Sequence, residues 1–197
     1  MLKRLFDIFV SFTGLLLLLP LFFIIGLVVR LGSPGSVFYR QQRVGKKGQL
    51  FRIFKFRTMQ SNSDSKGLLT VGGRDPRITR SGYFLRKYKL DELPQLLNVL
   101  IGDMSFVGPR PEVKKYVDLY TPQELQVLNV RPGITDYASL EYFSENELLA
   151  TSDDPETTYI QEIMPAKLKL NARYIEEAGL LTDVKIMGRT ILKIFTS

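Results

Sequence analysis

An uncharged and almost wholly apolar run dominates the first part of the chain. No Asp, Glu, Lys or Arg occurs between Asp7 and Arg30. As one straight helix, segment 8–29 would be about 33 Å long, which is enough to cross a bilayer. Pro20 lies near its middle, where it removes a helical hydrogen bond and favours a kink. The pattern predicts a membrane-associated helix with an interruption at Pro20.

The flanking charges and the arm length argue against a simple crossing. Basic residues stand on both sides of the run, so the positive-inside rule names no translocated end. The arm before Pro20 is only about 18 Å long as a helix, roughly half a bilayer. We therefore predict a re-entrant helix-break-helix over residues 1–31, which enters one leaflet and returns to the cytoplasmic face. The alternatives are a single crossing and a cleaved signal peptide, although no small-residue cleavage site follows the run.

Strand-like alternation follows the apolar run. Segment 36–59 contains two such stretches around a turn at 45–48, which is typical of a β-hairpin. Segment 60–73 is polar and contains glycines, which predicts a loop.

The second strand of the predicted hairpin carries cations on one face. Lys55 and Arg57 share that face, while Phe54 and Phe56 share the other. Two fixed cations can bind phosphate groups. Equally, they can form a solvated face over a phenylalanine core, and the pattern leaves both interpretations open.

A helical pattern begins at an acidic pair. Asp91 and Glu92 precede leucines at helical spacing across segment 93–100, and Asp is a good helix N-cap. We therefore expect both carboxylates at the positive end of a helix dipole, where phosphate-bearing ligands are also favoured. Taken alone, such a pair is most often only a cap. A short helix is expected just upstream, within segment 74–86.

Helical periodicity dominates the rest of the chain. Two amphipathic helices are predicted within segment 111–130, and a longer helix after a turn at 153–155. Segment 182–195 mixes apolar residues with Lys and Arg, so it would lie on an anionic membrane surface or close the core. At 197 residues the chain suits one cored domain. We predict an α+β fold with a small hairpin and a mostly helical cytosolic domain over 32–197, with amphipathic helices at the membrane interface.

The composition restricts the chemistry. The chain has no Cys and no His, which excludes disulfides, thiolate metal sites and every mechanism that needs a histidine. A carboxylate nucleophile with an oxygen-bound Mg²⁺ is one of the few schemes left. The net charge of +7 predicts anionic partners: nucleic acid, phosphorylated small molecules or an acidic membrane face.

One long motif narrows these options. The stretch LDELPQLLNVLIGDMSFVGPRP, residues 90–111, resembles nearly the whole signature of the small monotopic phosphoglycosyl transferases. These bacterial sugar transferases begin polysaccharide and glycan assembly, including exopolysaccharide and capsule. The resemblance spans the chain from Lys3 to about Thr135. It implies a location at the bacterial inner membrane, with the catalytic domain on the cytoplasmic face.

The resemblance also implies a reaction and its cofactor. Asp91 would attack a UDP-sugar and release UMP, forming an aspartyl-phosphosugar. Glu92 would be its partner at a Mg²⁺ ion, so both carboxylates are implied metal ligands. The phosphosugar would then pass to a polyprenyl phosphate, specifically undecaprenyl phosphate.

Several cations are candidates for binding the phosphates. Arg110 stands between two prolines, which restrict the backbone and lower the entropy lost on binding. The spacing of Asp75, Arg77 and Arg86 also fits the family pattern. The predicted phosphate-binding set is Lys55, Arg57, Arg77, Arg86 and Arg110.

The chain departs from the family pattern in two places. Leu19 stands where Ser is expected before the membrane proline, and segment 136–150 diverges after the RPGIT motif. That segment would shape the sugar pocket, with Asp136, Tyr137 and Tyr142 as candidates, or would form a surface loop.

Two other classes of function remain as alternatives. A single-pass membrane scaffold would recruit assembly enzymes without catalysis. A membrane-tethered protein could instead bind nucleic acid or anionic lipid, although a membrane-embedded N-terminus makes a nucleic-acid site awkward, and we expect no nucleic-acid partner. The sugar and the oligomeric state, a homo-oligomer included, are left open.

Overall fold

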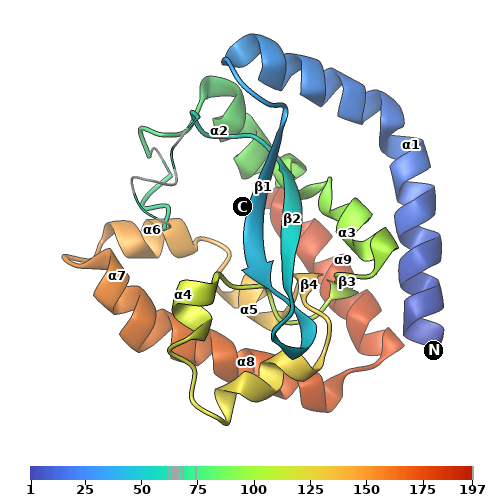
Figure 1. The fold of residues 1–197 in the computed structure, drawn as a ribbon, viewed down its shortest axis with the longest axis vertical. Coiled ribbons are helices and arrows are strands. Elements are labelled where there is room, and N and C mark those ends of the chain that lie inside the picture. Colours follow the sequence, from blue (N-terminus) through green and yellow to red (C-terminus); the bar gives the residue numbers. More distant parts are fainter. Residues whose placement is uncertain (62, 64–66, 68, 74, 197) are drawn as a thin grey trace.

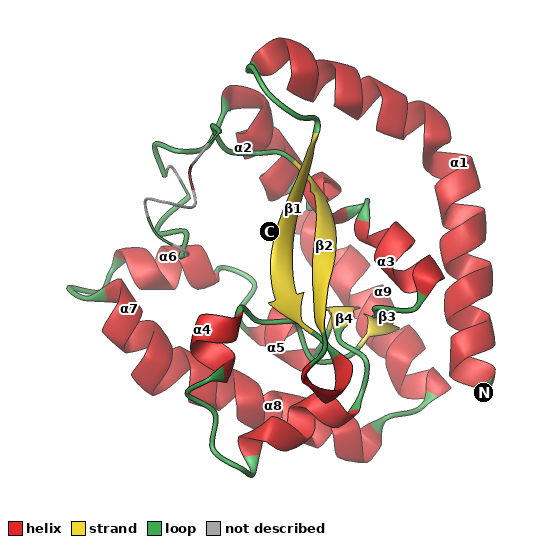
Figure 2. Cartoon of the chain, in the orientation of Figure 1, coloured by secondary structure: helices red, strands yellow, loops and turns green. Residues whose placement is uncertain are grey.

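The computed structural model describes residues 1–61, 63, 67, 69–73 and 75–196. Helices make up most of it, together with one antiparallel and one parallel pair of strands (Figure 1 and Figure 2). The mixed helix and sheet class is confirmed. The predicted loop at 60–73 lies only partly within the described residues.

Along the described chain the elements are α1 (Leu2–Gly32), β1 (Phe38–Val44), the 3-10 turn η1 (Lys46–Gly48), β2 (Leu50–Phe56), α2 (Arg80–Lys87), the 3-10 turn η3 (Leu90–Glu92), α3 (Gln95–Ile101), β3 (Ser105–Val107), α4 (Lys114–Val117), the 3-10 segment η4 (Glu124–Asn129), β4 (Gly133–Thr135), α5 (Tyr137–Glu141), α6 (Glu145–Ala150), α7 (Pro155–Thr158), the π-helical segment η5 (Tyr159–Ile163), α8 (Met164–Glu177) and α9 (Leu180–Thr196).

Helix α1 forms one long edge of the molecule (Figure 1). It is continuous through Pro20, and its axis changes direction about halfway along. The structure therefore replaces the predicted break by a bend. A proline removes one helical hydrogen bond and bends the axis, while the apolar chain on both sides stays helical. The helix is long and apolar enough to cross a membrane, and only 11% of its most apolar window is buried in the protein.

The N-terminal end of α1 is bound to the rest of the protein. Arg4 donates hydrogen bonds to the carbonyl oxygens of Val99 and Leu100, at 2.6 and 2.9 Å, near the end of α3. Lys3 pairs with Asp183 of α9 at 2.6 Å. These contacts join the start of the apolar helix to two helices that lie far away in sequence.

The predicted hairpin is confirmed. β1 and β2 are antiparallel across the turn η1. Asn98 of α3 joins this hairpin: its amide donates to the carbonyl oxygen of Arg52, and its side-chain oxygen accepts from the backbone of Phe54, both at 2.9 Å. Asn98 is fully buried. The hairpin and α3 are thereby held in a fixed relation, with Lys55 on the strand beside them.

The acidic pair does not cap a helix, which corrects the predicted N-cap. Asp91 and Glu92 lie in η3, and α3 begins only at Gln95. Lys89 has φ 54°, in the left-handed region, and redirects the chain between α2 and the turn. Pro94 has no N–H to donate to the preceding turn, so the helical hydrogen bonding is interrupted there.

A short parallel pair, β3 and β4, brings the GPR and RPGIT motifs together. Its backbones approach closely beyond β3: a Cβ atom on Gly133 would lie 2.1 Å from the backbone nitrogen of Gly108. Both positions therefore require glycine. The contact places Arg110 and Asp136, which follow the two strands, beside one another.

The remaining helices form the main core and a partly apolar surface. Around α8 the largest buried cluster includes Tyr116, Leu149 and Tyr159. The predicted helices within 111–130 are short, α4 and the 3-10 segment η4. The predicted helix beyond 155 is confirmed as α7 to α8.

Helix α9 has two different faces. Asp183 and Ile186 are buried against the protein, so one face closes the core. The other exposes apolar side chains, including Leu181, Leu192 and Phe195. The alternative in which the last helix closes the core is therefore confirmed. That its unburied apolar stripe lies on a membrane surface stays a prediction.

Candidate active site

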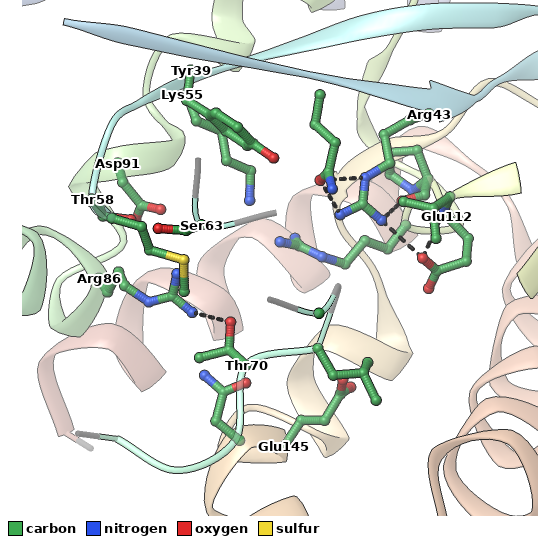
Figure 3. A pocket seen from close by; sticks show the side chains of 18 of the residues that line it. Tyr39, Arg43, Lys55, Thr58, Ser63, Thr70, Arg86, Asp91, Glu112 and Glu145 are labelled. Carbon is green, nitrogen blue, oxygen red and sulfur yellow. Dashed lines mark hydrogen bonds and ion pairs between the residues drawn. The ribbon is translucent and has the colours of Figure 1, made fainter. Parts of the chain in front are cut away.

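Asp91 and Glu92 lie where two cavities meet. The larger cavity, of about 870 Å³, extends from the hairpin towards α6 and α8. The smaller, of about 450 Å³, lies among α3, α5 and α9. Asp91, Lys55 and Arg110 line both cavities. Figure 3 shows the larger one, with Asp91 and Lys55 at one end and Glu112 at the other.

Glu92 is fully engaged by cations. Lys55 pairs with it at 2.9 Å, and the Arg110 guanidinium donates to both of its oxygens. Burial of Glu92 opposes ionisation, but Arg110 and Lys55 together outweigh that penalty and hold the pKa of Glu92 well below its usual range. Glu92 is therefore an ionised, fixed anchor for two cations.

Asp91 is buried and differs from its neighbour. It is 5% exposed, and among the described residues no side chain pairs or hydrogen-bonds with its carboxylate. Burial is the main cause that raises the pKa of Asp91; the Glu92 charge adds to it, and Lys55 opposes it. A carboxylate that is buried, lines two cavities and keeps its lone pairs available is a strong nucleophile once ionised.

Cations surround the pair. Arg86 lines both cavities and donates to the Thr70 hydroxyl at 3.1 Å. Burial is the largest cause that lowers the pKa values of Lys55 and Lys89, with Glu92 acting against it in both cases. An excess of positive charge around one available carboxylate suits a substrate with several phosphate charges.

The backbone around Arg110 is held by Asp136. The Asp136 carboxylate accepts from the backbone N–H of Arg110 at 3.1 Å and from Ser139 at 2.6 Å. Asp136 is fully buried. The candidate role of Asp136 in a sugar pocket is therefore replaced by a structural one: it caps α5 and positions the arginine.

Lys55, Arg86 and Arg110 thus converge on the acidic pair as predicted from the sequence, while Arg57 and Arg77 do not. Arg57 is 7% exposed, and its guanidinium donates to carbonyl oxygens of Ser33 and Pro34 at the end of α1. Arg77 pairs with Asp75 at 2.6 Å and donates to carbonyl oxygens of the neighbouring loop. Both line the larger cavity, so phosphate binding by them stays a prediction.

None of the three candidates chosen from the sequence in segment 136–150 lines the larger cavity. Tyr142 lines the smaller cavity instead. Tyr137 hydrogen-bonds Glu177 at 2.7 Å and lines neither cavity.

The far end of the larger cavity is a polar region that sequence reasoning missed. Arg43 pairs with Glu112 at 2.8 Å (Figure 3), and Glu112 accepts from the Tyr159 hydroxyl. Asn171 is 6% exposed, and its side-chain oxygen has no partner among the described residues. These residues come from four separate elements and loops. Only Glu112, directly after the signature, lies near a sequence signal.

The described residues contain no group of three or more acidic side chains that could hold a metal ion by themselves. They do place two adjacent carboxylates at one point. Any Mg²⁺ there would need further oxygens from substrate or water.

Comparison with known proteins places this geometry in context. The family model described as "Bacterial sugar transferase" matches residues 1–197. The UDP-N-acetylgalactosamine-undecaprenyl-phosphate N-acetylgalactosaminephosphotransferase of Aeromonas hydrophila is 38% identical, over 98% of this chain and 44% of the relative. The UDP-glucose:undecaprenyl-phosphate glucose-1-phosphate transferase of Escherichia coli (strain K12) is 37% identical, over 100% of this chain and 41% of the relative.

The chain therefore spans less than half the length of these two relatives. It spans 88% of a Bacillus subtilis relative named uncharacterized sugar transferase EpsL, to which it is 38% identical. The match over the whole chain, together with these identities, shows that the protein belongs to the bacterial sugar transferase family.

Proposed function

We propose that this chain is a phosphoglycosyl transferase that moves a sugar-1-phosphate from a UDP-sugar to undecaprenyl phosphate, the first membrane step of exopolysaccharide or glycoconjugate synthesis. The names of two relatives describe transfer of this kind, with N-acetylgalactosamine phosphate in one and glucose phosphate in the other. One observation carries the proposal: an available carboxylate, Asp91, lies beside a fully engaged one, Glu92, at the junction of two cavities.

The reaction proceeds in two displacements at one phosphorus. An oxygen of Asp91 attacks the phosphorus that bears the sugar, and the bond from that phosphorus to the bridging oxygen breaks. UMP leaves with the bridging oxygen, and an aspartyl-phosphosugar remains. A phosphate oxygen of undecaprenyl phosphate then attacks the same phosphorus and frees Asp91. The product is the lipid diphosphate sugar.

The cations stabilise charge on the phosphoryl oxygens. Lys55 and Arg110 are held in place by Glu92 before any substrate arrives, so little reorganisation is needed when charge develops. Arg86 lines both cavities and can contact the transferred phosphate from either side. The polar end of the larger cavity, at Glu112 and Asn171, would receive the rest of the donor.

The residues present fit a Mg²⁺ ion that arrives with the diphosphate. Mg²⁺ usually binds one or two carboxylates plus substrate phosphates. Asp91, whose carboxylate is available, would be the main protein ligand, and Glu92 would join through a lone pair that Lys55 and Arg110 leave open. When bound, the ion would neutralise the diphosphate and the leaving group.

We further propose that α1 is re-entrant and that the catalytic domain, 32–197, faces the cytoplasm. Both ends of the helix contact the same folded unit, through Arg4 and Lys3 at one end and Arg57 at the other. A helix that crossed the bilayer would carry one end away from that unit and break one set of contacts. The bend at Pro20 and the exposed apolar face instead suit a helix embedded in one leaflet.

The test is UMP release by the full chain in detergent, given Mg²⁺, undecaprenyl phosphate and a panel of UDP-sugars. Release with one donor, abolished by Asp91→Asn, is the expected result and names the sugar. Omitting the acceptor should leave one equivalent of UMP per enzyme, as the covalent step requires. Folded protein that releases no UMP with any donor would favour the scaffold alternative, which predicts that Asp91→Asn retains function in cells.

A further inference from the structure

The two cavities that meet at Asp91 differ in character. The larger is lined mainly by polar and aromatic side chains, among them Arg43, Glu112 and Asn171. The smaller has an apolar wall, made by Leu93, Leu96, Phe106, Met187, Ile191 and Ile194. The Asp91 carboxylate is thus accessible from a polar cavity and from a partly apolar one.

The inner end of the smaller cavity is cationic. Lys55, Arg86, Lys89 and Arg110 line it, against the carboxylates of Asp91 and Glu92. Glu145 also lines it but is paired with Lys167 at 2.7 Å.

Lys89, like Arg86, is a cation of this group that Glu92 does not pair with. Its ammonium lies 4.7 Å from the centre of the Phe143 ring, and no acidic partner forms a salt bridge with it in the part of the chain that the structure describes. The cavity therefore combines a positive end with an apolar wall, which is the complement of an amphiphile with an anionic head.

The outer part of the smaller cavity adjoins an apolar surface. Ile191 lines the cavity and is 56% exposed, while its neighbours Leu192 and Phe195 are 66% and 77% exposed without lining it. α9 thus presents apolar side chains both inside the cavity and on the outer surface. A chain that leaves a membrane could pass along this helix without exposing its length to water.

We propose that the smaller cavity binds the phosphate end and first isoprene units of the polyprenyl phosphate acceptor, while the larger cavity binds the nucleotide sugar. The phosphate lies between Lys89 and Arg86 and faces Asp91; the prenyl chain follows Met187, Ile191 and Ile194 out to the membrane. This assignment rests on the proposed function and adds where its lipid substrate binds. Because both displacements are in line with Asp91, the acceptor phosphate takes the position that the UMP phosphate has left, while the uridine and the prenyl chain lie in different cavities.

The first experiment separates the two displacements. UMP release without acceptor reports the donor step, and steady-state turnover reports the acceptor step. Ile191→Asn should leave the donor step unchanged and raise the KM for undecaprenyl phosphate about tenfold, since it removes one large apolar contact. Lys89→Asn, which keeps a residue tolerant of the left-handed backbone, should raise the same KM by a larger factor than it lowers the rate of the donor step.

Leu192→Asn is the matched control. It places the same polar side chain on the same exposed helix, one residue away and outside the cavity. Equal increases of the KM for undecaprenyl phosphate in Ile191→Asn and Leu192→Asn would mean that α9 acts only in membrane attachment, and would overturn the assignment. So would an Ile191→Asn defect in the donor step alone.

A second experiment does not depend on turnover. A prenyl phosphate with a photoactivated diazirine near its phosphate is added to the full chain, and labelled peptides are identified by mass spectrometry. Labelling within residues 86–96 or 187–194, which line the smaller cavity, supports the assignment if undecaprenyl phosphate competes with it, even if no UDP-sugar is turned over. Labelling elsewhere, with both segments unlabelled, rejects it even if UMP release confirms the reaction.

Discussion

Asp91 and Glu92 are neighbours in sequence, yet their surroundings act on their charges in opposite ways. Burial raises the pKa of Asp91, while Arg110 and Lys55 overcome burial at Glu92 and hold its pKa well below the usual range. Because Glu92 is ionised, it holds Lys55 and Arg110 in place. Asp91 carries its negative charge at a cost, and in the proposed reaction that charge is neutralised when the carboxylate bonds to phosphorus.

This difference predicts opposite effects on stability. A folded-state pKa above the unfolded one means that ionised Asp91 destabilises the fold above that pKa, so Asp91→Asn should raise Tm at pH 7.5 while abolishing turnover. The lowered pKa of Glu92 contributes stability above its unfolded pKa, so Glu92→Gln should lower Tm. Shifts of a few degrees are expected, because about 1 kcal/mol changes Tm by about 2–4 °C at this chain length. Thermal unfolding that moves in the same direction for both variants would contradict the assignment.

The same pKa shift predicts the acid limb of the activity profile. The donor step needs ionised Asp91, so its rate should fall as pH decreases through a pKa above the ordinary Asp value. Glu92 cannot cause this limb, because its pKa is shifted downwards. The measurement is the rate of UMP release without acceptor between pH 4 and 9. A rate that stays constant down to the ordinary Asp range would show that burial does not control the nucleophile.

Arg110 should not be replaceable by lysine. Its guanidinium donates to both oxygens of Glu92, and an ammonium cannot reproduce that planar pair. We expect Arg110→Lys to lower kcat about 10²-fold to 10³-fold, the usual cost of one preorganised donor. Arg173→Lys is the control, since Arg173 also pairs with a glutamate but is 64% exposed. Similar losses in both would point to general destabilisation.

At the scale of elements, close backbone approach positions Arg110, the arginine that we propose binds phosphate. β3 and β4 are each three residues long, and the contact between Gly108 and Gly133 lets the chain after β3 lie against the start of β4. Gly133→Ala would place a Cβ atom 2.1 Å from the nitrogen of Gly108. We expect a loss of about 1–3 kcal/mol in unfolding free energy, together with lower turnover because Arg110 moves. Denaturant unfolding and UMP release measure the two effects.

Gly188→Ala in α9 is the control for that variant. Among the described residues, no atom outside its own stretch of helix lies within 4 Å of the Cβ it would add. Alanine stabilises a helix interior by about 0.5–1 kcal/mol over glycine. Gly133→Ala with stability equal to or above that of the wild type would refute the packing argument.

Local patterns predicted most elements because those elements follow local rules. The alternation of residues around a turn with glycines was sufficient to predict β1 and β2. The helical periodicity of apolar residues was sufficient to predict α8 and α9. The predicted N-cap at Asp91 was wrong because Pro94 has no N–H to continue the hydrogen bonding of the turn, and α3 begins only after it. The break at Pro20 became a bend because the apolar residues beyond it continue the helix.

Site residues inside the signature motif were predicted from the sequence. Residues that reach the site only through tertiary contacts were missed. Asp91, Glu92 and Arg110 lie in one signature, and only α3 and β3 separate the acidic pair from the arginine. Arg57 sits beside Lys55 in sequence, yet its guanidinium binds the carbonyl oxygens that end α1. The polar end around Asn171 is built from distant segments. Sequence spacing does not predict contacts between segments that lie so far apart along the chain.

At the scale of the whole molecule, the apolar helix and the catalytic unit form one body. α1 contacts α2, α3 and β2, and its ends are held by the unit that carries Asp91. The exposed apolar side chains of α9 add a second apolar surface. Such an arrangement brings a soluble donor and a membrane-bound acceptor to one carboxylate only if that carboxylate lies close to the membrane face.

The topology can be tested cleanly because the chain contains no cysteine. Two variants, Leu2→Cys and Asp153→Cys, each place a single thiol at an exposed position, one before the apolar helix and one far beyond it. If α1 is re-entrant, a membrane-impermeant maleimide should label neither in intact spheroplasts and both in inverted vesicles, because both positions face the cytoplasm. A single crossing would instead expose only one of the two thiols from outside. Labelling both in denaturing detergent shows that each thiol is reactive. Opposite sidedness would require the contacts of Lys3 with Asp183 and of Arg4 with α3 to be broken in the membrane, and would reject both the re-entrant helix and the single rigid body on which the positions of the two cavities depend.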